Sequence, residues 1–166
     1  METVPEEIVE QTWTRIASLS QDDSETLAHK MTEQQPIVAV YLSAVGGDLL
    51  TEEEHEIMLY IGLVVWQIMN SGKSRLPMVT EAALEDAEDR NLKILESMQD
   101  ESPGDFWVAI KNLIQNYNQI EVLKYVLEAL MEEDEDFAAD DSVREEMKGM
   151  MLIYLKSVID CFDQFE

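Results

Sequence analysis

Residues 57–69 read IMLYIGLVVWQIM, the longest apolar stretch of the chain. These thirteen residues are too few for a membrane-spanning helix, which needs about 20 apolar residues. The stretch contains no charged side chain, so a helix built from it would be apolar on most sides and would need other protein elements around it. It therefore predicts a central, buried helix inside a folded protein.

Polar residues on either side mark the ends of this predicted helix. Thr51 followed by Glu54 forms a capping box, in which each side chain accepts a hydrogen bond from the other residue's backbone N–H. After Asn70, the sequence SGKSRLP at residues 71–77 combines glycine, serine and proline, which favour turns and loops. The sequence therefore predicts a helix over residues 51–70 and a linker over residues 71–79.

The rest of the chain also follows the helical period. Apolar residues recur three and four positions apart, and no stretch alternates as a half-buried strand does. Pro36 breaks one segment, Asp22 and Ser142 are expected to begin two others, and Ser102 with Pro103 begins a further one. The predicted helices span about residues 5–19, 22–34, 36–45, 51–70, 80–98, 102–117, 119–132 and 142–162. We therefore predict an all-α fold of about eight helices.

Three stretches of the first half resemble stretches of the second half, in the same order. RIASLSQDDS resembles KILESMQDES, EQQPIVAVYLSA resembles NQIEVLKYVLEA, and EEHEIMLYIGL resembles EEMKGMMLIYL. The three pairs begin at residues 15 and 93, 33 and 118, and 53 and 145. The conserved order indicates an internal duplication.

A duplication predicts two four-helix units, residues 1–70 and 80–166, joined by the linker at 71–79 and sharing one core as a single domain. A short α-solenoid with a long concave face is the alternative architecture. Because residues 57–69 are apolar on most sides, we favour a compact bundle in which residues 150–159 of the second unit pack against them.

The net charge of −25 is the strongest compositional signal. Such a field repels nucleic acid and anionic membranes, so we expect direct binding to neither, whereas a basic protein partner would be attracted. The simpler interpretation is that the acids keep an apolar-rich chain soluble. Cys161 is the only cysteine, so no internal disulfide can form, and with no signal peptide at the N-terminus we expect a cytoplasmic location.

Glu52 and His55 are the only candidates for metal ligands. Their Glu-x-x-His spacing is that of di-iron carboxylate bundles. Such sites need a second motif of this kind and two further glutamates, whereas His29 has Glu25 four residues before it. The acids at the start of this helix are instead expected to complement its dipole and face water. We therefore predict no metal and no other cofactor.

Residues 134–145, DEDFAADDSVRE, have partial similarity to a calcium-binding EF-hand loop. Ala138 at the fifth position supplies no ligand, and Ala139 replaces the glycine required at the sixth, so calcium binding is not expected.

The same acidic stretch holds one aromatic residue, Phe137. It could enter an apolar groove of a basic partner, or it could pack back onto the bundle. We therefore name the partner-binding candidates Asp134, Glu135, Asp136 and Phe137.

No motif for catalysis or for cofactor binding is present. The chain has two histidines and one cysteine, and it lacks glycine-rich phosphate loops, HExxH and GxSxG patterns. We therefore assign no catalytic residue. Cys161 is expected to be a small buried apolar residue, and Trp13, Trp66 and Trp107 are expected to lie in the core.

These observations favour a non-enzymatic, acidic, helical protein-interaction module, such as an adaptor, a small regulator or a chaperone-like protein. Its partner is expected to be a basic protein of unknown identity, and the sequence does not define the oligomeric state. One alternative is a DNA mimic that occupies the basic groove of a nucleic-acid-binding protein. A second alternative is a carboxylate–metal enzyme built in a helical bundle.

Overall fold

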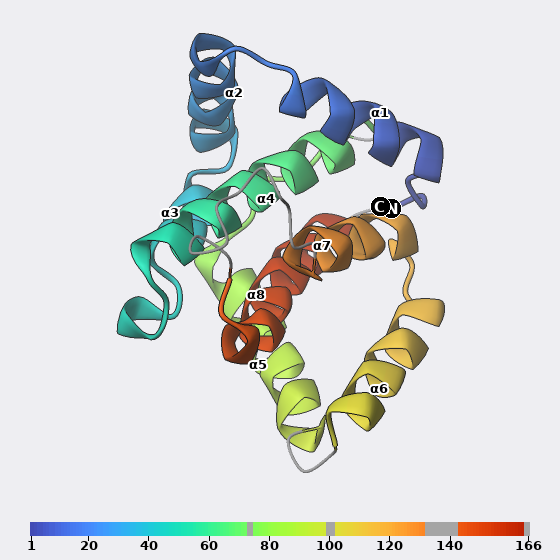
Figure 1. Cartoon of the computed structure of the whole chain (residues 1–166). Coiled ribbons are helices and arrows are strands. Elements are labelled where there is room, and N and C mark those ends of the chain that lie inside the picture. The colour runs from blue at the N-terminus through green and yellow to red at the C-terminus, as the bar shows by residue number, and fades with distance from the viewer. Residues whose placement is uncertain (73–74, 99–101, 132–142, 165–166) are drawn as a thin grey trace.

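The computed structural model describes residues 1–72, 75–98, 102–131 and 143–164. Within these residues there are eight α-helices, one short 3-10 helix and no strand, so the all-α prediction is confirmed (Figure 1). The helices are α1 (Glu6–Ala17), α2 (Gln21–Gln34), α3 (Pro36–Ala44), α4 (Glu52–Asn70), α5 (Glu81–Met98), α6 (Pro103–Gln115), α7 (Ile120–Met131) and α8 (Glu145–Asp163).

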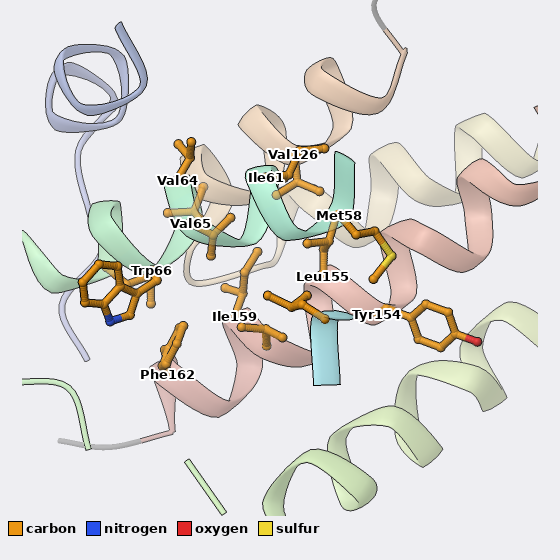
Figure 2. Close-up of a cluster of buried hydrophobic side chains, with 14 of the residues drawn as sticks. Met58, Ile61, Val64, Val65, Trp66, Val126, Tyr154, Leu155, Ile159 and Phe162 are labelled. Carbon is orange, nitrogen blue, oxygen red and sulfur yellow. The ribbon is translucent and has the colours of Figure 1, made fainter. Parts of the chain in front are cut away.

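Two helices of 19 residues each, α4 and α8, form the centre of the molecule. They contact each other; α1, α2, α3 and α7 also pack on α4, while α5 and α7 pack on α8. The buried side chains form one continuous apolar cluster, so the packing is compact. Figure 2 shows part of the α4–α8 contact, with labelled side chains that include Met58, Ile61, Val65, Trp66, Leu155, Ile159 and Phe162. Most of residues 57–69 are buried, as predicted, although Tyr60 is 43% exposed, and α4 contacts α8, the helix that contains residues 150–159.

Helix starts follow the predicted caps at Thr51 and Ser102 and differ at the start of α2. The capping box of Thr51 is present, and the hydroxyls of Thr80 and Ser102 accept from backbone N–H groups of the first turns of α5 and α6. Asp22 does not begin α2; Ser20 does, because its Oγ accepts from the Asp23 N–H at 3.2 Å. Helix α8 starts at Glu145, after Arg144, and Ser142, which was expected to begin it, lies outside the described residues.

The linker prediction falls on a segment whose end is packed into the core. Leu76 and Val79 are buried in the main apolar cluster. The side chain of Gln35, itself buried, donates to the Pro77 carbonyl at 2.7 Å and accepts from the Val79 N–H at 2.9 Å. This amide therefore fixes residues 77–79 against the start of α3.

A close approach between α3 and α4 depends on Gly62. A Cβ atom at this position would lie 2.2 Å from Leu42 Cδ1 and 3.3 Å from both Leu42 Cγ and Cδ2. Leu42 is fully buried, so its side chain has little room to move away. The absence of a side chain at position 62 is what allows the two helices to approach this closely.

We predict that Gly62→Ala lowers the free energy of unfolding by about 1–2 kcal/mol, because the cost of overpacking exceeds the gain in helix propensity. Urea-induced unfolding followed by circular dichroism measures the change. Gly104→Ala in α6 is the matched control, since a Cβ there meets no atom within 4 Å. Equal effects of the two substitutions would contradict the packing argument.

Candidate functional site

The metal-ligand candidates do not converge. Glu52 is exposed at the start of α4, and His55 Nε2 lies 3.0 Å from the carbonyl oxygen of Val45. His29 is exposed on α2, with Nε2 3.3 Å from a carboxylate oxygen of Glu33. The part of the chain that the structure describes contains no group of three or more His, Cys, Asp or Glu side chains placed to hold a metal ion.

The partner-binding candidates Asp134, Glu135, Asp136 and Phe137 lie outside the described residues. The calcium-loop comparison covers residues 134–145, most of which are also outside them. These interpretations therefore stay predictions.

One acid at the start of α4 was predicted wrongly to face water. Glu54 is buried, because its carboxylate is held by Arg144, the residue that precedes α8. Glu54 Oε1 accepts from Arg144 Nη2 at 2.7 Å and Nε at 3.1 Å, and also from the Thr51 N–H at 2.9 Å. Oε2 accepts from the Arg144 N–H at 3.3 Å. This ion pair joins the first turns of the two central helices.

Burial raises the pKa of Glu54, but the hydrogen bonds from Arg144 and from the Thr51 backbone outweigh it, and the pKa is lowered overall. A carboxyl whose pKa is lower in the folded state than in the unfolded chain stabilises the fold above the unfolded value, about 4.3 for glutamate. That contribution is lost as the pH falls through the folded pKa.

We predict that Glu54→Gln lowers the free energy of unfolding by about 1–2 kcal/mol near neutral pH, because Arg144 loses its charged acceptor. The difference from the native chain should shrink as the pH falls below about 4. Urea titrations at a series of pH values test this. Glu53→Gln, at an exposed position of the same turn, is the control and should change stability little at any pH.

A second buried polar cluster joins α5, α8 and the residue Tyr117 that follows α6. Lys156 Nζ donates to Asn91 Oδ1 at 2.8 Å and to Asp160 Oδ2 at 2.9 Å. Asn91 Nδ2 donates to Ser157 Oγ at 3.0 Å and to the same Asp160 oxygen at 2.9 Å. The Tyr117 hydroxyl donates to Asp160 Oδ1, and the Lys156 ammonium lies 4.8 Å from the centre of the Tyr117 ring. Each charged group therefore has several partners.

The charged and polar groups of this cluster hold the surrounding helices together. Burial, followed by the neighbouring Asp160 carboxylate, raises the pKa of Tyr117, which keeps its hydroxyl protonated as a donor. Burial also raises the pKa of Cys161 to about 11, so its thiol is a protonated, buried group, as predicted. The cluster fixes the orientation of α5 and of the α6–α7 connection against α8.

We predict that Lys156→Met lowers the free energy of unfolding by about 2–4 kcal/mol, because it leaves the Asp160 carboxylate buried without its cation. Lys156→Met with Asp160→Asn should cost less than the single change, since the amide carries no charge and still accepts from Tyr117. Chemical denaturation of both variants measures this coupling.

Lys124→Met is the matched control for this cluster. Lys124 pairs with Glu121 at 3.1 Å on the surface of α7, where an ion pair contributes about 0–1 kcal/mol. A cost for Lys156→Met as small as that of the control would contradict the structural role of the cluster.

The tryptophan prediction is confirmed for Trp66, which is fully buried, and Trp107 is partly buried. It was wrong for Trp13, whose side chain is 41% exposed. The core face of α1 is formed by Val9, Thr12 and Ile16, which recur three and four residues apart. One residue after Thr12 corresponds to a rotation of about 100° around the helix, which takes Trp13 off this face.

Trp13 instead lies on the acidic side of α1. Helical spacing places it beside Glu10, one turn earlier, and near Glu6, two turns earlier; both glutamates are exposed. The positions of the buried residues along α1 show that residue 13 lies off the core face. The presence of a tryptophan in an apolar helix does not show this. An exposed indole flanked by carboxylates is the feature of the described surface that sequence analysis missed.

Comparisons with known proteins add no relationship, since no family model, no curated protein and no solved structure matches this chain significantly. Among the described residues, no helix has both the length and the apolar character of a membrane-spanning segment. The functional interpretation therefore depends on the residues of this chain.

Proposed function

We propose that this chain is a non-enzymatic protein-interaction module that binds a basic protein partner. The observation that carries the proposal is the exposed Trp13 indole on the acidic side of α1. Tryptophan is one of the residues that most often dominate the binding energy of protein interfaces. The net charge of −25 would speed the approach of a basic partner, and the indole would hold it.

The local chemistry of α1 favours a lysine or arginine in the bound partner. The face of an indole ring attracts a cation, and Glu6 and Glu10 add carboxylates at the same side of the helix. The apolar part of a long basic side chain can cover the ring while its charge stays near the acids. Such a contact combines electrostatic attraction with apolar burial.

A basic protein partner is preferred over a DNA-mimic function because of where the acids lie. Exposed carboxylates occur on several helices, for example Glu7 of α1, Glu25 of α2, Glu53 of α4 and Glu85 of α5. A mimic of a phosphate backbone would concentrate its acids along one face, so this distribution supports a general acidic surface. The experiment below also has results that would favour the DNA-mimic function or the carboxylate–metal function.

The internal duplication and the cytoplasmic location are further proposals. The duplication is supported by matching helix contacts, because α1 packs on α4 as α5 packs on α8, α2 packs on α3 as α6 packs on α7, and α3 packs on α4 as α7 packs on α8. A cytoplasmic location and an adaptor or regulatory role agree with a single, buried cysteine and an acidic surface.

We predict that Trp13→Ala weakens partner binding by about 30-fold or more, as expected for an interface anchor worth at least 2 kcal/mol. The native and variant chains are used as baits in a lysate of the source organism at about 50 and about 300 mM salt, and captured proteins are identified by mass spectrometry. Tyr60→Ala is the matched control, since Tyr60 is an aromatic residue with a similar exposed fraction, 43%.

A basic protein that is captured by the native and Tyr60→Ala chains but lost with Trp13→Ala supports the proposal. Equal capture by both variants would contradict the role of Trp13. A captured nucleic-acid-binding protein that DNA displaces would favour the DNA-mimic function instead. Stoichiometric metal in the purified chain, with no captured protein, would favour the carboxylate–metal function.

A further inference from the structure

The helix α3 differs from the rest of this acidic surface because none of its nine residues, PIVAVYLSA, is charged. Val38, Ala39 and Leu42 face the core, while Pro36, Val40, Ser43 and Ala44 are exposed, and the helix lies at the outside of the molecule (Figure 1). Val40 is 65% exposed, the largest exposed fraction among the large hydrophobic side chains of the described residues. The outer face of α3 is therefore apolar and free of charge.

Met78 extends this apolar surface at the start of α3. Its side chain is 62% exposed, although the residues on either side of it are held by the Gln35 amide. Because Gln35 immediately precedes Pro36, this bracket places Met78 at the N-terminal end of the helix. A rigidly held backbone that presents a flexible apolar side chain to water is suited to a contact surface.

A groove of about 740 Å³ adjoins Met78 and carries both signs of charge. Its lining includes Glu33 from the end of α2, Asn70 from the end of α4, and Arg75. The Glu33 carboxylate lies 3.3 Å from His29 and is 66% exposed, and Arg75 is also exposed. The surface made by the outer face of α3, Met78 and this groove is called here the α3 surface.

We propose that the α3 surface pairs with the α3 surface of a second copy of this chain. In a two-fold dimer both copies contribute the same patch to the contact. If one residue of the first copy contacts a different residue of the second, the symmetry repeats that contact with the two copies exchanged. A surface with one carboxylate, Glu33, and one guanidinium, Arg75, beside an uncharged strip satisfies this rule. Glu33 and Arg75 give this groove no local excess of carboxylates, so it offers a basic partner less attraction than the acidic side of α1.

Long-range electrostatics point to the same surface. Two chains with a net charge of −25 each repel one another, and the repulsion is least costly where the contact itself contains no excess of acids. Pro36, Val40 and Met78 offer such a contact. The apolar patch is small, so the dimer is expected to be weak and to depend on protein concentration.

The dimer responds to salt in the opposite direction from binding of a basic partner. Salt screens the repulsion between the two acidic chains, so the dimer should tighten severalfold between about 50 and about 500 mM sodium chloride. Sedimentation equilibrium of the full chain over a range of concentrations measures this as a mass that rises toward twice 19.0 kDa. Weakening by salt would contradict the proposal.

Val40→Glu places two added charges at the two-fold contact and should weaken the dimer about tenfold or more. Val108→Glu is the matched control, because Val108 is also a helical valine, on α6, with an exposed fraction of 56%. Both substitutions change the net charge equally, and unchanged far-ultraviolet circular dichroism checks the fold. Equal effects on the dimer would show that general charge, and not the α3 surface, controls association.

A charge exchange tests the pairing of Glu33 with Arg75. Glu33→Arg alone and Arg75→Glu alone should each prevent self-association, because each places like charges opposite one another. An equimolar mixture of the two variants should restore a dimer that contains one of each. A chain that stays monomeric under all these conditions, or a mixture that fails to associate, would overturn the proposal without affecting the Trp13 test.

Discussion

The constraint on which the rest of this structure depends is the burial of two long helices that are apolar on most sides. Neither α4 nor α8 could face water along its length, and packing them together removes part of each surface at once. The remaining helices then need to supply only one apolar face each. This arrangement explains how a chain with a net charge of −25 folds into one core: most of the acids stay exposed, where water and salt reduce their repulsion, and the buried Glu54 and Lys156 are paired with opposite charges.

Apolar burial alone does not fix how helices are oriented, because it has little directional preference. In this structure the orientation is set by a few buried polar groups. Lys156 and Asp160 hold Asn91 of α5, Glu54 holds Arg144 at the start of α8, and Gln35 holds residues 77–79. Each of these contacts joins segments more than 40 residues apart in the sequence. A shift of one helix by one residue would leave a buried charge or amide without its partner, which costs more than the loss of an apolar contact of similar size.

The sequence predicts well the structural features that depend on residues close together in the chain. The burial of individual side chains that depends on distant residues is harder to predict. The helical period, the capping box at Thr51 and the buried helix at 57–69 follow from local patterns. The contact of this helix with the last one is between distant residues, and it was predicted from the resemblance between the two halves of the chain. Glu54 differs locally from its exposed neighbour Glu53 only by its capping box with Thr51, and its burial depends on Arg144, 90 residues later. Trp13 was misassigned because its residue type outweighed its position, which lies beyond the edge of the Val9–Thr12–Ile16 face.

The contrast between Trp13 and α3 shows why exposed apolar residues are informative in so acidic a protein. An apolar side chain on the surface gains free energy only when something covers it, and the charges around it decide what can approach. Trp13 has Glu10 and Glu6 on the same side of its helix, so a basic partner is attracted to the indole and an acidic one is repelled. Val40 lies on a helix with no charge at all, so no carboxylate of that helix attracts a basic partner to it. The same net charge therefore favours association at one surface and opposes it at the other, so the two surfaces call for partners of different chemistry.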